Sequence, residues 1–393
     1  MKKHTIIVSG LACTYPLGGV AWDYIQYLHG FHRLGHDVYY LEDTGGWAYD
    51  PHQVTFTDDY SYHIAYIRDY LKALDPDLAG RFCVRDPSDN FYGLTREELA
   101  GVVARATAVF NISTTLWLRE EYQGIPVKVL IDSDPMYTQA DIPRYLAGQA
   151  DEKARKNIDH LKLHDRFFTF AENFGQPGCI IPKGIFDWRP TRQPIVLDAW
   201  NTNRPPASQA FTTVLSWQPK ESGPEIEGRR YGGKNMEFQR FMDLPKKTSA
   251  SLELALGQGR PPREELTAKG WNLKDGFAMS ETPWKYRDYI WDSFAEFSLA
   301  KNAYVASGSG WFSCRSACYL AAGRPCVVQD TGFSKFMPTG QGILAFSSED
   351  EALAGIEKVR ADWPKHSRRA RELAGEWFDS DKVLAKLLQE ALE

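Results

Sequence analysis

The stretch "ASGSGWFSCRSACYLAAGRPCVVQD", residues 306–330, has the pattern of a glycine-rich loop, a helix and a strand. We expect a strand at 304–306 before the glycines, a helix from about 313 to 322, and a β-branched strand after it. The first turn of such a helix offers unpaired N–H groups and the positive end of the dipole, which favours a bound phosphate. Arg315 puts a cation in that turn, and an anion held by its guanidinium would explain it. An ordinary turn with an exposed arginine is the alternative.

The first half of the chain alternates strand-like and helical runs, which is typical of a parallel sheet with crossover helices. The expected strands are 4–10, 37–43, 108–112, 127–131 and 167–170, and the expected helices are 20–34, 60–74, 95–106 and 141–162.

Prolines crowd the region from 182 to 206, which favours a domain connection, and we place the boundary near residue 190. The alternation then restarts, with expected strands at 211–216, 251–256, 277–280, 304–306 and 326–328. The sequence therefore predicts an α/β protein of two doubly wound, Rossmann-like domains, residues 1–190 and 191–370, followed by a C-terminal helix, 371–393, that is broken near Asp379. Ligands of such domains bind beyond the carboxyl ends of the strands, so two facing domains form a cleft.

Composition excludes several classes of protein. The 46 lysines and arginines against 51 aspartates and glutamates give a net charge of -5, which disfavours nucleic acid as the main partner. No window approaches the ~18 consecutive apolar residues of a membrane span. Six scattered cysteines are typical of a reducing compartment, so we expect a cytoplasmic protein. No cysteine and histidine spacing completes a ligand set, so we expect no metal site.

Polar residues and glycines follow the expected strands, where a ligand would bind. Gly18 and Gly19 begin a helix, where a plain glycine turn is the alternative. Asp132 and Asp134 follow a buried strand and are candidate proton acceptors, although Asp134 could instead begin a turn before Pro135. Gln139 lies just beyond the same strand. Glu172 and Asn173 follow another strand, where a capping or turn role is the alternative. Lys234 lies in the glycine-containing loop 217–238, which could simply be a solvated charged loop.

A dinucleotide site is a competing interpretation of the opening stretch. Gly308, Gly310 and Ser313 nearly spell the GxGxxG fingerprint, and Asp330 stands where an acidic residue would bind a ribose hydroxyl. The third glycine is a serine, however, and Arg315 would have no role in such a site.

Three segments resemble the GT-B glycosyltransferases: "YPLGG" at 15–19, "RLGHDVYYLE" at 33–42, and the whole run from 300 to 348. The resemblance spans nearly the whole chain. It implies that the first domain binds the acceptor, a small molecule or a glycan, that the second binds a nucleotide-diphosphate sugar, and that the C-terminal helix packs back on the first domain. It also implies a reaction that needs no metal ion, with the sugar nucleotide as co-substrate and no further cofactor.

The resemblance assigns roles to particular residues. It implies that Gly310, Ser313, Cys314, Arg315, Ser316 and Lys234 bind the donor diphosphate, that Gly18, Gly19, Asp330, Thr331 and Gly332 lie at the donor sugar, and that Gln139, Glu172 and Asn173 lie on the acceptor side. The retaining enzymes usually carry two glutamates eight residues apart at this helix, where this chain has Gly310 and Cys318. The stereochemical outcome is therefore open. We expect a glycosyltransferase, with a sugar-nucleotide epimerase, an NAD(P)-dependent enzyme and a catalytically silent sugar-nucleotide-binding protein as alternatives.

Overall fold

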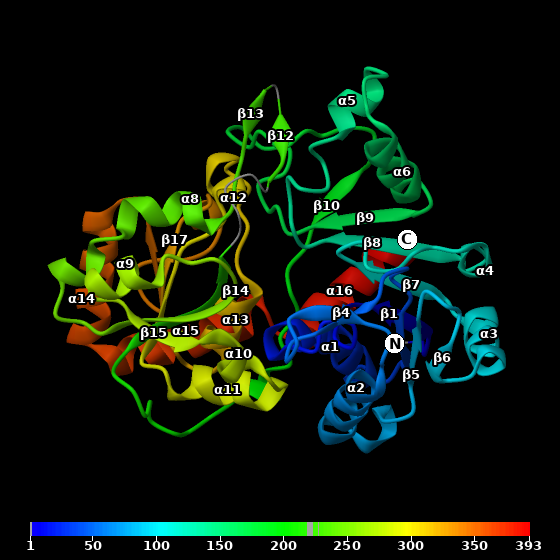
Figure 1. Cartoon of the computed structure of the whole chain (residues 1–393), viewed down its shortest axis with the longest axis horizontal. Coiled ribbons are helices and arrows are strands. Elements are labelled where there is room, and N and C mark those ends of the chain that lie inside the picture. The colour runs from blue at the N-terminus through cyan, green and yellow to red at the C-terminus, as the bar shows by residue number, and fades with distance from the viewer. Residues whose placement is uncertain (1, 218–222, 227) are drawn as a thin grey trace.

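A computed structural model of the chain describes residues 2–217, 223–226 and 228–393. It contains two mainly parallel sheets, each with its own helices (Figure 1). Part of the loop 217–238, named above as a candidate phosphate-binding loop, lies outside the described residues. The domain around the first sheet is called the N-terminal domain and that around the second the C-terminal domain. The two lie side by side in Figure 1.

The sheet of the N-terminal domain has the strand order β10-β9-β8-β7-β1-β2-β5-β6, with β6 antiparallel to its neighbour and the other pairs parallel. Neighbouring side chains of β1 (Thr5–Ser9) enter different cores. Ile6 and Val8 pack with helix α1 (Gly18–Arg33), whereas Ile7 packs with helix α3 (Arg96–Arg105). This alternation is expected for a strand covered on both faces. The strands are β1 (Thr5–Ser9), β2 (Asp37–Glu42), β5 (Phe82–Arg85), β6 (Phe91–Gly93), β7 (Ala108–Ile112), β8 (Val127–Asp132), β9 (Arg166–Thr169) and β10 (Trp188–Pro190).

The N-terminal domain carries a hairpin and several helices besides its sheet. Thr95 and Glu98 form a capping box that begins α3. The predicted helix 141–162 is two helices, α5 and α6, because Gly148 adopts a left-handed conformation (φ 71°) between them. The elements are α1 (Gly18–Arg33), the hairpin β3–β4 (Ala48–Asp50 and Thr55–Thr57), α2 (Ser61–Leu74), α3 (Arg96–Arg105), α4 (Glu120–Gln123), α5 (Ile142–Leu146) and α6 (Glu152–Leu161).

The C-terminal domain has a wholly parallel sheet in the order β15-β14-β11-β16-β17-β18. The strands are β11 (Phe211–Trp217), β14 (Leu252–Gly259), β15 (Asn272–Asp275), β16 (Ala295–Ser298), β17 (Cys326–Gln329) and β18 (Ile343–Phe346). A separate hairpin pairs β12 (Glu225–Ile226) with β13 (Arg229–Arg230), and the helices are α7 (Leu197–Trp200), α8 (Lys234–Phe238), α9 (Arg263–Ala268), α10 (Gly276–Ser280), α11 (Pro283–Asp292), α12 (Asn302–Ala306), α13 (Cys314–Ala321) and α14 (Glu349–Ala361).

Two predicted strands of this domain are wrong. Residues 277–280 belong to α10, which begins at the Asp275 side chain, and residues 304–306 belong to α12. The strand that precedes the glycine loop is β16, at 295–298, and a helix separates it from Gly308. The dinucleotide fingerprint requires its glycines to follow a strand directly, so its structural context is missing here.

Two helices close the chain: α15 (Trp363–Trp377) and α16 (Ser380–Leu392), with Asp379 as the N-cap of α16. Helix α16 packs against α1 of the N-terminal domain, as expected for the C-terminal helix, and Gly30 permits the close approach because an added Cβ would lie 2.4 Å from Leu384 Cδ1. The junction of these helices is bonded to the segment that leads out of the first domain. Ile195 donates its N–H to Phe378 O (2.7 Å) and accepts one from Ser380 (2.9 Å).

Candidate functional site

A cavity of about 790 Å³ lies between the two domains. Its wall on the N-terminal side is formed by the start of α1, the β3–β4 hairpin and the loop after β8. The C-terminal side contributes the ends of β11 and β14, the start of α10 and the start of α13. The cavity therefore lies beyond the carboxyl ends of parallel strands of both sheets, where ligands of such sheets bind. Its size suits a ligand of several dozen atoms.

Arg315 has partners within the protein. Its Nε donates to Glu296 Oε1 (2.8 Å), its Nη1 donates to Val214 O (2.9 Å), and its Nη2 donates to Ser298. Glu296 is fully buried and the arginine side chain is 11% exposed, so the pair is a buried ion pair that joins α13 to the sheet. A bound anion is therefore not needed to explain the arginine. Arg315 also lines the cavity, and its role in diphosphate binding stays a prediction.

Lys234, the first residue of α8, differs from Arg315 in having no partner within the part of the chain that the structure describes. It lines the cavity, and no hydrogen bond or ion pair reaches its ammonium from the described residues. Burial lowers the pKa of Lys234 well below its usual range, and the nearby charge of Arg315 lowers it further. An anion in the cavity would offset both effects. The ammonium is thus held in a place that favours binding of a negatively charged ligand.

The start of α13 contributes further groups. Ser313 is the N-cap, its side chain caps no helix N–H, and it lines the cavity with Cys314. Ser316 and Gly310 lie behind this wall. Ser316 is buried beside a smaller void of about 20 Å³, and Gly310 has a positive φ of 76° and donates its N–H to Thr331 O. Of the residues predicted to bind the diphosphate, Lys234, Ser313, Cys314 and Arg315 therefore line the cavity, whereas Gly310 and Ser316 do not.

Asp132 is buried and lies outside the set of described residues that line the cavity. Thr138 and Gln139 each donate a hydrogen bond of 2.7 Å to its carboxylate, and Thr169 donates one of 2.8 Å. Desolvation raises the pKa of Asp132 to about 6 against the effect of these donors. These hydrogen bonds hold the loop after β8 in place. Gln139 uses both ends of its amide in this network, because its Nε2 donates to Asp132 and its Oε1 accepts the Met136 N–H. Neither residue is placed to touch a ligand in the cavity.

Asp134, in contrast, lines the cavity. Its carboxylate forms an ion pair of 2.6 Å with Lys301 and accepts a hydrogen bond from the Tyr304 hydroxyl, both from the other domain. Asp134 therefore links the two domains at the edge of the cavity, and its carboxylate is half exposed.

Asp23 was missed by the sequence analysis. It lies on α1, lines the cavity and is exposed to it, yet enough protein surrounds the carboxyl that desolvation raises its pKa to about 7. A hydrogen bond from the Cys314 thiol and the charge of Arg315 lower this pKa, while the charge of Asp134 raises it. A carboxyl with such a pKa can accept a proton near neutral pH. The helical pattern around Asp23 carries no motif that could have singled it out.

The glycine pair at the start of α1 serves contact between the domains. An added Cβ on Gly18 would lie 2.5 Å from Thr282 O and 2.7 Å from Tyr286 Cβ, and one on Gly19 would lie 3.2 Å from the Tyr286 ring. Gly19 lines the cavity and Gly18 lies beside it. The close approach explains the glycines without a ligand.

The remaining candidates lie around a second interdomain contact. The Asn173 amide donates to Gly308 O and Gly332 O, both at 3.0 Å. The Asp330 carboxylate accepts the Gly332 N–H (2.8 Å), and Thr331 donates its hydroxyl to Trp311 O. Glu172 pairs with Arg192, while burial raises the pKa of its carboxyl. None of Glu172, Asn173, Asp330, Thr331 and Gly332 is among the described residues that line the main cavity.

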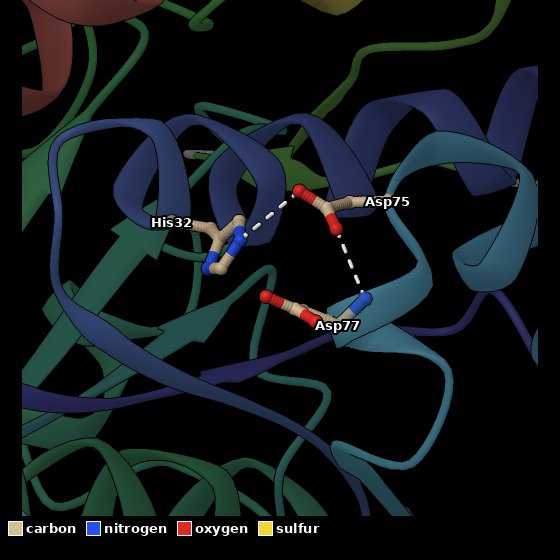
Figure 2. Close-up of side chains that lie close together, drawn as sticks. All are labelled: His32, Asp75 and Asp77. Atoms are coloured by element: carbon tan, nitrogen blue, oxygen red, sulfur yellow. Dashed lines mark hydrogen bonds and ion pairs between the residues drawn. The ribbon is translucent and has the colours of Figure 1, made fainter.

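One group of side chains elsewhere has the make-up of a metal site. Figure 2 shows His32, at the end of α1, beside Asp75 and Asp77. Asp75 interacts with His32 Nε2 at 3.1 Å and accepts the Asp77 N–H at 2.9 Å, so it acts as a helix cap and an ion-pair partner. These contacts account for the group without an ion.

Comparison with known proteins identifies the fold. No protein-family model and no curated protein matches the chain. Among solved structures, an α-glucosyltransferase in complex with UDP and a 13-mer DNA is similar over the full length of both chains, with a TM-score of 0.58 and 10% identity. HepE of Anabaena in complex with UDP-glucose matches 98% of this chain and 100% of its own (TM-score 0.53, 11% identity).

A third match is the sucrose-phosphate synthase of Thermosynechococcus elongatus, over 98% of both chains, with a TM-score of 0.50 and 12% identity. At such identities the likeness concerns the fold alone. Two parallel α/β domains around a shared cavity, with a C-terminal helix returned to the first domain, are the architecture predicted from the sequence. The chain therefore has the GT-B fold of these glycosyltransferases.

Proposed function

We propose that the protein is a glycosyltransferase that moves a sugar from a nucleotide-diphosphate donor to a small-molecule or glycan acceptor. The observation that carries this proposal is the desolvated ammonium of Lys234, which has no partner among the described residues, in the interdomain cavity of a GT-B fold. A diphosphate there would receive the charge of Lys234, the uncapped start of α13 and the remaining N–H groups of Arg315.

The sugar transfer places two demands on the cavity. As the bond from the anomeric carbon to the diphosphate oxygen breaks, its electron pair goes to the diphosphate, which Lys234 and the α13 N-terminus stabilise. As the acceptor oxygen bonds to that carbon, its proton must leave. In an inverting reaction Asp23 or Asp134 takes this proton, and Asp23 is the better candidate because Asp134 is paired with Lys301.

The reaction is proposed to need no metal ion, because the protein supplies its own cations beside the diphosphate. Activity should then persist in EDTA. Transfer that required a divalent ion would contradict this part of the proposal while leaving the donor class intact.

Thermal unfolding with UDP, GDP, dTDP and NAD tests the donor class. A nucleotide diphosphate at 100 times its Kd should stabilise the fold by about 2.7 kcal/mol. Stabilisation by NAD alone would contradict the proposal. Where a nucleotide diphosphate binds, its sugar conjugates are incubated with the protein and products are analysed: transfer to an added acceptor supports the proposal, and epimerisation without an acceptor contradicts it.

A further inference from the structure

The β3–β4 hairpin and the residue before it expose large apolar side chains, of which Val54 lines the cavity. Trp47 is 38% exposed, Val54 71% and Phe56 59%. The hairpin spans residues 48–57 and Trp47 directly precedes it, so these three are close in sequence. Exposed apolar residues that stand singly would need no explanation. Val54 is different, because it lines the cavity together with the apolar Leu17, Val20 and Pro51, and contiguous apolar surface tends to mark a binding site.

Val54 has an unfavourable backbone conformation. Its φ is 56°, in the left-handed region, which is a genuine outlier for a β-branched residue. Glycine or asparagine would adopt this conformation at lower cost. Keeping an exposed valine there costs stability and serves no core, which is the pattern of a residue retained for contact with a ligand.

Aromatic packing holds the hairpin in place. The Tyr15 and Tyr49 rings stack at 5.5 Å, and Phe56 meets both edge-on, at 6.2 Å and 5.8 Å. From the other domain, Phe277 meets His52 edge-on at 5.0 Å. The apolar surface is therefore supported by rings on both sides of the cavity and presents a rigid face to a ligand.

The hairpin is part of the cavity wall. Tyr49, Pro51 and Val54 line it together with Leu17 and Val20 of the same domain. The carboxylates of this wall are Asp23 and Asp134, whereas the cations that line the cavity come from the C-terminal domain (Lys234, Arg263, Lys301 and Arg315). A sugar-like acceptor would need many hydrogen-bonding groups, and this wall instead offers a mainly apolar face with a few polar groups.

We propose that the β3–β4 hairpin is the acceptor-binding element and that the acceptor has a flat, apolar body carrying a hydroxyl group. The body lies against Tyr49, Pro51 and Val54, and the hydroxyl points to the carboxylates. This inference rests on the proposed function, since only a transferase needs an acceptor.

Calorimetric titration with 2-naphthol, in the presence of UDP, tests the inference, with glucose as the probe that has hydroxyls and no apolar body. Val54→Gly and Val54→Asn remove the apolar contact and suit the backbone, so both variants should fold. Each should weaken 2-naphthol binding by about five- to tenfold, from the apolar area lost. UDP binding should not change. Ile185→Asn, at another exposed apolar residue (48%), is the matched control and should leave both affinities unchanged.

Several outcomes would overturn the inference. These are equal 2-naphthol affinity in the wild type and the Val54 variants, no 2-naphthol binding by the wild type, or preferential binding of glucose. Sedimentation with phosphatidylcholine–phosphatidylglycerol vesicles, abolished by Val54→Asn, would assign the hairpin to a lipid surface instead. A failure of UDP, GDP and dTDP all to bind the wild type is a different result, because it removes the proposed function and with it the acceptor role of a still apolar hairpin.

Discussion

The two walls of the interdomain cavity differ in charge and in how their charges are satisfied. Of the cations in the wall of the C-terminal domain, Arg315 is neutralised by the buried Glu296, whereas the neighbouring Lys234 has no partner among the described residues. The wall of the N-terminal domain has carboxylates and apolar side chains. The difference teaches that a charged residue lining a cavity is informative about ligands only after its internal partners are known.

Arg315→Ala should have the largest effect, on stability. It would leave Glu296 charged and buried without its partner. We therefore expect the free energy of unfolding to fall by about 3–5 kcal/mol, which is typical of a broken buried ion pair. Urea unfolding measures the loss. The double variant Arg315→Met with Glu296→Gln removes both charges and should recover most of it. Full stability of the single variant would show that the ion pair is not what holds α13 to the sheet.

Lys234→Met should show the opposite behaviour. Removing a desolvated cation that no described residue pairs with should stabilise the ligand-free protein by about 1–2 kcal/mol. The same change should weaken UDP binding by roughly 10- to 100-fold, through the lost charge-assisted contact. Calorimetry measures the affinity, and Lys301→Met, which removes a lysine already paired with Asp134, is the control. Unchanged UDP affinity in Lys234→Met would contradict the assignment of this lysine.

The glycine pair gives a comparison within one helix. Gly18→Ala should destabilise the protein by about 1–3 kcal/mol, because the methyl group meets a backbone carbonyl at 2.5 Å that has little room to move. Gly19→Ala meets only the Tyr286 ring at 3.2 Å and should cost less. Urea unfolding of the two variants measures the two losses in free energy of unfolding. Equal losses would indicate that the domains adjust freely at this contact.

Asp23→Asn should have the smallest effect on stability, and one that depends on pH. Because the folded protein raises the pKa of Asp23 from 3.8 to about 7, the protonated carboxyl favours folding, and this contribution is lost as the pH rises from about 4 through 7. Over that range the free energy of unfolding of the variant should therefore rise relative to that of the wild type. The difference should be on the order of 1 kcal/mol after allowance for solvent in the cavity. Unfolding at pH 5 and pH 8.5 measures it, with the exposed Asp187→Asn as control.

Transfer activity would sharpen the same comparison. If Asp23 accepts the proton, activity should rise with pH around its pKa in the wild type, and Asp23→Asn should remove both the activity and this rise. An unaltered pH profile in the variant would leave Asp134 as the proton acceptor.

Sequence patterns predicted the architecture well and the second sheet less well. Short apolar runs such as 277–280 and 304–306 fit a strand or a helix equally, and both are helices. The true strand β16 was hidden because it contains Glu296, a charge that becomes tolerable in a core only through its ion pair with Arg315. Edge strand β15 was missed because it is largely polar and exposed.

The candidate site was predicted in outline and not in its residues. Glycines and charged residues after strands pointed to the right edges of both sheets, since strand ends meet at one edge. The state of the carboxyls in the cavity depends on the other domain: Cys314 and Arg315 of α13 moderate the raised pKa of Asp23, and Lys301 occupies Asp134. Asp132 and Asp134 were both candidates, and the structure separates them. Asp132 is buried and accepts hydrogen bonds from Thr138, Gln139 and Thr169. Asp134 lines the cavity.

The bonds between Ile195 and the junction of α15 and α16 have a mechanical consequence. The chain leaves the first domain and returns to it through neighbouring segments, and these two backbone hydrogen bonds join both passages into one connection. We infer that the two domains rotate as rigid bodies about this connection, with neither sheet distorted. A disulfide across this connection should leave donor entry unimpeded, whereas one between α1 and α11 should block it.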